Sequence, residues 1–237
     1  MQQILGAMRK AIVDYNMIQD GDGIAVGVSG GKDSLVLLSG LAQLRKFIGI
    51  DYRLVALTID PCFHGRQTDY TAITGLCGRL GVPHVIRRSQ LGDILLVERK
   101  EKSPCSLCAR MRRGMLHDMA KEEGCNKIAL GHHRDDAVET FLMNLVYEGR
   151  LGSFQPVSYL SRKDLTMIRP LCLATERDIT ACARREGLPV LAKNCPVDGA
   201  TVRQETKEWL QEMERGKLPD LSKKIFGAMC RAHLSGW

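Results

Sequence analysis

Two adjacent glycines followed by a lysine mark the segment of this chain best suited to bind an anion. The segment reads Ser29-Gly30-Gly31-Lys32-Asp33-Ser34. A strand-like apolar run, Ile24–Val28, precedes it, and apolar residues at helical spacing follow it. A turn between a strand and a helix leaves the first helical N–H groups, which carry partial positive charge, facing whatever binds there. Because Lys32 adds a full charge, the segment predicts a phosphate site.

The spacing of this turn differs from two common phosphate-binding patterns. It lacks the two widely spaced glycines of the Walker A motif, and it lacks the Gly-x-Gly-x-x-Gly of dinucleotide sites. A Ser-Gly-Gly turn alone is ordinary, but the strand before it and the helix after it favour nucleotide binding. The segment resembles the PP-loop, a pyrophosphate-binding turn of enzymes that split ATP between its α and β phosphates. That resemblance implies ATP contacts from all six residues, Ser29 to Ser34.

Polar residues also follow two further strand-like runs, Tyr52–Asp60 and Lys127–Gly131. In open parallel sheets the ligand crevice lies beyond the carboxyl ends of the strands, so these residues should approach the glycine turn. Asp60 could bind nucleotide, although a carboxylate after a strand is often only a cap or turn residue. Asp135 and Asp136 fall in the first turn of a predicted helix. They could complement the helix dipole, coordinate Mg²⁺ on ATP, or position the attacked group.

The cysteines include one pair at ligand spacing, Cys105 and Cys108, and a more distant candidate, Cys195. Ser103 and Pro104 predict a helix start, which places the pair on one face of the first turn. The helix dipole and the arginines just beyond should favour thiolates. Such a pair can be a redox dithiol, half of a zinc site or part of an iron–sulfur site. Three thiolates would suit a 4Fe-4S cluster with one iron open, and an open iron can hold a sulfide.

These segments must be positioned by alternating strands and helices. The pattern predicts an α/β fold with a doubly wound parallel sheet. Residues 1–200 are expected to form the catalytic domain, including an N-terminal helix, and residues 201–237 a helical extension packed on it. The predicted strands and C-terminal helices are Ile24–Val28, Tyr52–Asp60, Pro83–Arg87, Lys127–Gly131, Thr166–Pro170, Pro189–Leu191, Arg203–Arg215 and Leu221–Ala232.

The composition of the chain indicates its cellular compartment and the kind of partner that it binds. The chain has 237 residues, a net charge of +7 and nine cysteines, and 5% of its residues are aromatic. No signal peptide or membrane span is predicted, so a cytoplasmic protein with reduced thiols is expected. The positive charge suits a polyanionic partner. The scarcity of aromatic residues argues against a base-stacking platform, so RNA would be recognised through phosphate and shape.

The combined motifs resemble the tRNA 2-thiocytidine synthetase family over nearly the whole chain. The matching segments are residues 16–22, 28–34, 105–114, 127–136 and 168–171. The resemblance implies the PP-loop, or adenine nucleotide alpha hydrolase-like, fold and a cytoplasmic homodimer. The implied activity places sulfur on C2 of cytidine 32 in the tRNA anticodon loop. Sulfur would come from a donor such as a cysteine desulfurase or from free sulfide.

The resemblance also implies roles for individual residues. Lys32, Asp33, Asp135 and Asp136 are the catalytic candidates, and Arg113 and Gly131 join the ATP contacts. ATP would bind with Mg²⁺, and Cys105, Cys108 and Cys195 would hold a 4Fe-4S cluster. The single Cys195-Pro196 is similar to tRNA 2-thiouridine synthetases, so a thiouridine product is one alternative. A PP-loop ligase or amidase without sulfur chemistry is a second alternative, and a non-enzymatic regulatory module that binds nucleotide and a cluster is a third.

Overall fold

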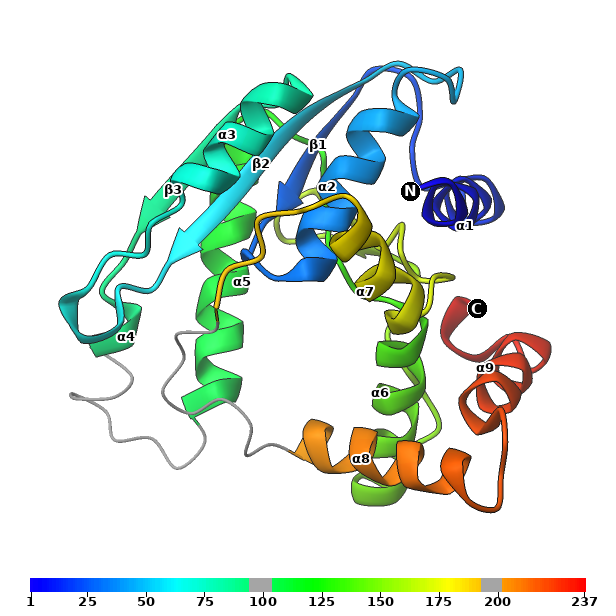
Figure 1. The fold of residues 1–237 in the computed structure, drawn as a ribbon. Coiled ribbons are helices and arrows are strands. Elements are labelled where there is room, and N and C mark those ends of the chain that lie inside the picture. Colours follow the sequence, from blue (N-terminus) through cyan, green and yellow to red (C-terminus); the bar gives the residue numbers. More distant parts are fainter. Residues whose placement is uncertain (94–103, 193–201) are drawn as a thin grey trace.

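The computed structural model describes residues 1–93, 104–192 and 202–237. Within these ranges the chain folds around one six-stranded sheet with the order β3-β2-β1-β4-β6-β5 (Figure 1). The strands are β1 (Asp22–Gly27), β2 (Tyr52–Asp60), β3 (His84–Arg88), β4 (Lys127–Ala129), β5 (Val157–Leu160) and β6 (Leu165–Ile168). All neighbouring strands pair in parallel except β5 and β6, which are antiparallel.

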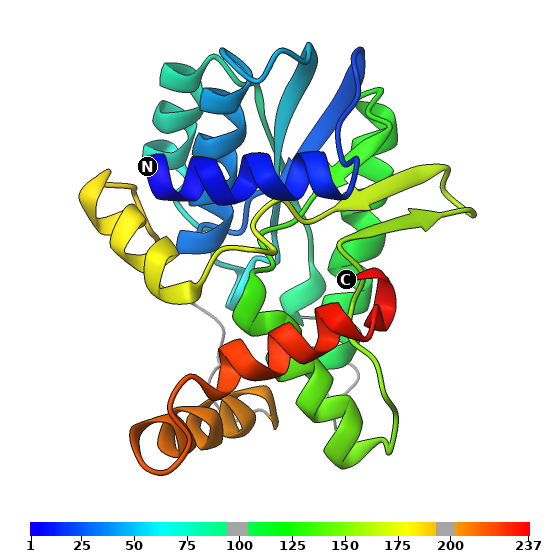
Figure 2. The ribbon, with the colours of Figure 1, turned by 90° about the vertical axis from the view of Figure 1, so that its right-hand side faces the viewer.

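Helices cover both faces of the sheet, as Figures 1 and 2 show. One face carries α1 (Gln2–Asp14), α2 (Lys32–Leu44), α3 (Thr71–Leu80) and α7 (Glu176–Arg185). The other carries α5 (Pro104–Glu122), which contacts β1, β2 and β4. The predicted doubly wound α/β fold is therefore confirmed. The short segments η1 (Phe63–Gly65), α4 (Leu91–Asp93) and η3 (Leu234–Gly236) complete the connections.

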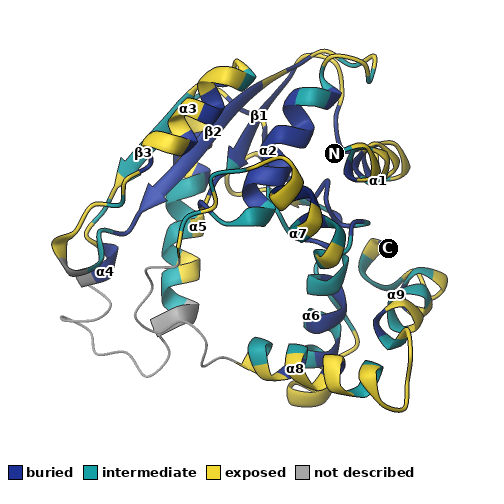
Figure 3. Cartoon of the chain, in the orientation of Figure 1, coloured by how far each residue is buried: buried dark blue, intermediate teal, exposed yellow. Residues whose placement is uncertain are grey.

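The central strands are buried almost continuously, as expected of a parallel sheet covered on both faces, and successive residues of β1 enter opposite cores. Ile24 and Val26 of β1 point into the core under α2, while Ala25 between them packs on the α5 side. Both faces of β1 are buried, and α2 beside it is almost wholly buried (Figure 3). This packing makes β1 and α2 a rigid support for the turn that joins them.

A second group of helices lies beyond the carboxyl ends of the strands. It contains α6 (Arg134–Tyr147), α8 (Val202–Arg215) and α9 (Leu221–Arg231), which pack on one another below the sheet in Figures 1 and 2. Val138, Leu142 and Leu210 form their small apolar core. The last two helices have the bounds predicted from the sequence to within one residue.

One local prediction was wrong, and one strand was missed. Residues 189–191 form no strand; Leu191 instead donates a single backbone hydrogen bond to the Gly30 carbonyl at 3.0 Å. The antiparallel strand β5 was not predicted, and it pairs with β6 at the edge of the sheet. Neither difference alters the pairing of the parallel strands β1, β2 and β4 that support the glycine turn.

Candidate functional site

The glycine turn lies where the strand order changes direction. The chain passes from β1 to β2 on one side, and β4 pairs with the other side of β1. At such a switch point the loops leaving the two central strands separate and open a crevice. Loop 29–34 leaves β1, and residues 130–133 leave β4 toward α6. The predicted convergence of these two segments is thus borne out by the fold.

Gly30 and Gly31 give loop 29–34 its shape. Gly30 has a φ of +85°, a conformation that residues with a side chain rarely adopt. A β-carbon there would also lie 2.9 Å from the Leu191 side chain. Gly31 is extended and caps α2, which begins at Lys32. The free N–H groups at the start of α2 are therefore directed into the crevice, as an anion site requires.

Two serine hydroxyls tie the loop together from within. Ser34 Oγ accepts from the Ser29 backbone N–H at 3.2 Å and donates to the Gly31 carbonyl at 2.9 Å. Ser29 Oγ accepts from the Gly31 N–H at 3.3 Å. The first and last residues of the loop are thus cross-linked, which pre-organises the backbone before any ligand arrives.

Gly131 brings the second loop directly against the first. A β-carbon on Gly131 would lie 3.1 Å from the Asp33 carbonyl carbon and 3.2 Å from the Ser34 nitrogen. Contacts this close mean that a side chain at this position would require the backbone of residues 33 and 34 to shift by a few tenths of an ångström. Gly131 therefore fixes how the end of β4 seats on the start of α2.

Lys32 is held between two carboxylates. Its Nζ donates to Asp33 Oδ1 at 3.0 Å and to Glu176 Oε1 at 3.2 Å. Burial lowers the pKa of Lys32, but the charges and hydrogen bonds of Asp33 and Glu176 outweigh burial and raise it above its ordinary value. The ammonium group is therefore a permanent cation at the mouth of the loop.

Asp135 and Asp136 both have partners within the fold. Asp136 Oδ2 accepts from the His133 N–H at 2.9 Å, and the His133 side chain accepts from the Asp136 N–H, which makes a capping box on α6. Asp135 Oδ2 accepts from the Glu176 backbone N–H at 2.8 Å and so holds the start of α7. His133 also lies 3.9 Å from Asp33 Oδ1, so Asp33 and Asp135 flank one imidazole.

Asp60 is completely buried at the end of β2. Its Oδ1 accepts from the Cys62 N–H at 3.1 Å, and its Oδ2 accepts from the Thr68 N–H at 2.9 Å. Both carboxylate oxygens thus hold the loop after β2, which favours the turn-residue interpretation of Asp60. A contact with nucleotide stays a prediction.

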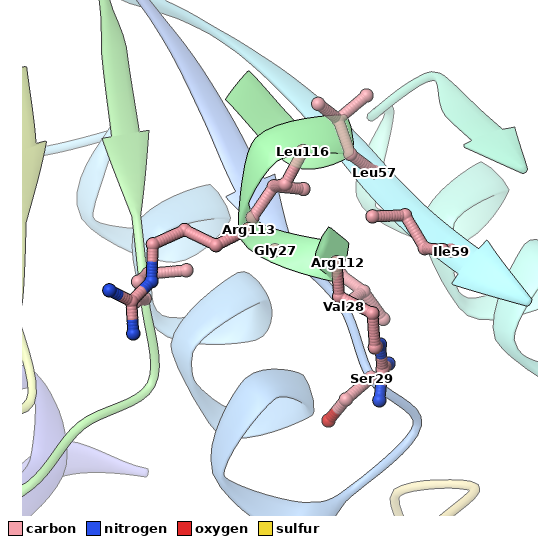
Figure 4. A pocket seen from close by; sticks show the side chains of 9 residues that line it. Gly27, Val28, Ser29, Leu57, Ile59, Arg112, Arg113 and Leu116 are labelled. Atoms are coloured by element: carbon pink, nitrogen blue, oxygen red, sulfur yellow. The ribbon is translucent and has the colours of Figure 1, made fainter. Parts of the chain in front are cut away.

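An open cavity of about 170 Å³ lies beside loop 29–34, between β1, β2 and α5. Its walls are largely apolar, formed by Val28, Leu57, Ile59, Leu116 and Leu130. Figure 4 shows that Arg112 reaches along one side toward Ser29, whereas Arg113 extends away on the other. Apolar walls suit the faces of a planar ring, and guanidinium groups suit phosphate. Arg113 lines this cavity, and its contact with ATP stays a prediction.

Two of the three predicted cluster cysteines belong to α5. The pair Cys105 and Cys108 lies in the first turns of α5, as expected from Ser103-Pro104, and Cys108 is half-buried. Cys195 lies outside the described residues, as does the Cys105 side chain. In the part of the chain that the structure describes, no three His, Cys, Asp or Glu side chains are grouped closely enough to hold a metal ion. Within the same part, each helix is too short or too polar to cross a membrane.

The sequence interpretation missed Glu176 and Lys207. Lys207 Nζ lies 2.6 Å from Glu176 Oε2, and Glu176 in turn contacts Lys32. The sequence gives a weak indication that Glu176 belongs to the site, because this residue begins a helix soon after a strand. It gives no such indication for Lys207, since one lysine in a polar helix has no distinguishing pattern.

Known proteins resemble this chain both in sequence and in fold. Residues 3–194 match the family model described as a PP-loop domain. The tRNA-cytidine(32) 2-sulfurtransferase of Pelobacter propionicus is 40% identical over 230 residues, covering 96% of this chain and 84% of the relative. The enzyme of the same name from Geobacter metallireducens is 41% identical, covering 90% and 84%.

A solved structure is also similar. The U34-tRNA thiolase NcsA from Methanococcus maripaludis, with its 4Fe-4S cluster, superposes with a TM-score of 0.78 and 25% identity. The match covers 98% of this chain and 78% of the thiolase.

Proposed function

This chain belongs to the PP-loop family of tRNA-cytidine(32) 2-sulfurtransferases, and we propose that it thiolates C2 of cytidine 32 in tRNA at the expense of ATP. The observation that carries the proposal is the pre-organised loop 29–34, with Lys32 at its mouth, in a chain 40% identical to such an enzyme over 96% of its length. The net charge of +7 suits the tRNA partner.

ATP would bind with its phosphates on loop 29–34 and its base in the neighbouring cavity. The N–H groups that open α2 and the Lys32 ammonium would hold the phosphate oxygens. The apolar walls of Leu57 and Ile59 would face the adenine ring, with Arg113 available to a phosphate or ribose. Asp33 and Asp135, which both lie beside His133, would accept Mg²⁺, which needs only one or two carboxylates besides phosphate oxygens.

The reaction would proceed in two displacements. The C2 oxygen of the base attacks the α-phosphorus of ATP, the bond to the β-phosphate oxygen breaks, and pyrophosphate leaves. Sulfide then attacks C2, the bond between C2 and its oxygen breaks, and that oxygen departs as part of AMP. Lys32 and the loop N–H groups stabilise the charge that develops on the phosphates during the first step.

Cys105, Cys108 and Cys195 would hold a 4Fe-4S cluster. The first two fit this role, because they lie one helical turn apart at the start of α5, where the helix dipole favours thiolates. When bound, the cluster would supply an iron with an open position at which sulfide can be held. The sulfur donor would be a cysteine desulfurase or free sulfide.

The proposal also covers the cellular compartment, the oligomeric state and the division into domains. The protein would act in the cytoplasm as a homodimer. Residues 1–200 would form the catalytic domain, and residues 201–237 the extension that carries α8 and α9.

The experiment that tests this proposal is to measure iron and acid-labile sulfide in anaerobically purified protein. A PP-loop ligase without sulfur chemistry would contain neither. We expect both, and we expect Cys195→Ala to bind ATP normally but to lose tRNA thiolation. Cys230→Ala, on α9, is the matched control and should keep both activities. If the protein contains no iron or sulfide but still forms AMP, the thiolase proposal is ruled out. If Cys195→Ala still thiolates tRNA, Cys195 is not a ligand of the cluster.

A further inference from the structure

Glu176 lies between two lysines that come from opposite ends of the chain. Its Oε1 accepts from Lys32 Nζ at 3.2 Å, and its Oε2 lies 2.6 Å from Lys207 Nζ. Lys32 opens α2 beside the glycines, whereas Lys207 belongs to α8, beyond the matched PP-loop domain. The three side chains are only 26–29% exposed, so water screens them less than an ordinary surface pair.

The position of Glu176 is fixed from several sides. It is the first residue of α7, its backbone N–H is held by Asp135, and Thr175 caps the same helix. Glu176 is therefore a fixed anion within reach of the lysine at the phosphate loop.

Such an anion would weaken phosphate binding if it acted alone. Lys32 faces two carboxylates, Asp33 and Glu176, so without Lys207 this group of charges would be net negative. ATP brings several negative charges to the same place, and like charges repel. With Lys207 present, two cations balance two anions.

Helix α8 is held in place by contacts other than Lys207. Arg203 donates to Glu139 Oε2 at 3.2 Å and to Thr140 Oγ1 at 3.0 Å, both on α6. Leu210 packs with Val138 and Leu142 in the small apolar core. Since these contacts dock the helix, Lys207 is not needed as its anchor.

We propose that Lys207 is a positioning residue of the ATP site: by pairing with Glu176, it prevents that carboxylate from neutralising Lys32. Helix α8 thereby supplies a positive charge that keeps the surroundings of loop 29–34 from becoming net negative, although this loop lies about 170 residues earlier in the sequence. This inference rests on the proposed binding of ATP to loop 29–34.

The test compares three variants by their affinity for Mg-ATP, measured calorimetrically at constant ionic strength. Lys207→Met leaves Glu176 uncompensated and should weaken binding roughly five- to tenfold. Glu176→Gln removes the competing anion and should bind ATP as well as the wild type or better. The double variant restores the balance of charge and should return to within roughly twofold of wild type. Lys217→Met, an exposed lysine just after α8, is the control for loss of one charge.

A different order of ATP affinities is expected if the ion pair between Lys207 and Glu176 is only structural. If the bridge mattered only for holding α7 to α8, Glu176→Gln and the double variant would both weaken ATP binding as Lys207→Met does, and the inference would be overturned. Equal affinities in all four proteins would overturn it as well. Lys207→Arg, which keeps the charge, should bind ATP normally, and melting temperatures show whether each variant is folded. Because ATP affinity is measured without tRNA, wild-type protein that binds ATP but forms no thiolated base would refute the proposed function alone.

Discussion

Gly131 and Asp33 lie so close that a β-carbon on the glycine would be 3.1 Å from the Asp33 carbonyl carbon. This contact joins the end of β4 to the first turn of α2, across the switch point of the sheet. The loop that would bind phosphate is thus positioned from two strands.

Gly131→Ala should displace the start of α2, because its neighbours are backbone atoms that cannot rotate away. Overpacking of this kind costs about 1–3 kcal/mol, so we expect ATP affinity to fall by roughly tenfold or more. Gly78→Ala, in α3, is the control, since a β-carbon there meets nothing within 4 Å. ATP titration and thermal unfolding of both variants make the test. Normal ATP binding by Gly131→Ala would show that the contact does not set the loop geometry.

Two serines of α2 should respond differently to loss of their hydroxyls. Ser34 Oγ holds the Ser29 N–H and the Gly31 carbonyl, so Ser34→Ala should loosen the loop at a cost of about 1 kcal/mol and weaken ATP binding about fivefold. Ser39 Oγ is buried and has no hydrogen-bond partner among the residues that the structure describes, so Ser39→Ala should leave stability and ATP binding unchanged or slightly improved. Similar losses in the two variants would argue against a special role for the Ser34 hydroxyl.

Stability should fall as the pH drops from about 6.5 to about 4, in part because of His132. Burial lowers the pKa of this histidine from 6.5 to about 4; Asp136 opposes the shift, and Arg169, Arg203 and His133 add to it. Between these pH values the unfolded chain binds a proton on His132 that the folded chain does not, so the free energy of unfolding decreases with falling pH.

The measurement is urea unfolding of wild type and His132→Gln across this pH range. The variant should show a shallower loss, with a difference of at most roughly 3 kcal/mol accumulated by pH 4. Parallel curves would mean that His132 titrates alike in the folded and unfolded chains.

The sequence predicted the parts of the site that are local. The turn at Gly30 and Gly31 could be recognised because its shape depends on consecutive residues and on the strand and helix beside them. The approach of residues 131–136 followed from a general property of parallel sheets, that loops leave the same edge. The close contact of Gly131 with Asp33 needed the structure, because spacing along the chain does not fix distances across a sheet.

Long-range pairs and atypical turns could not be predicted. Glu176 and Lys207 are 31 residues apart, and only the docking of α8 on α6 brings them together. The β5–β6 hairpin turns without a glycine, since Asp164 adopts the left-handed conformation with a φ of +47°. Residues 189–191 have strand-like composition, but Leu191 bonds to Gly30 instead of to a strand.

The most direct test of the central claim is mass spectrometry of tRNA nucleosides after incubation of anaerobically prepared protein with tRNA, Mg-ATP and sulfide. We predict 2-thiocytidine at position 32, formed only when ATP is present, with AMP and pyrophosphate as co-products. Lys32→Ala should abolish it. A tRNA that acquires no sulfur while ATP is cleaved, or that acquires it without ATP, would contradict this account; sulfur on a uridine instead would retain the mechanism but refute the assigned base.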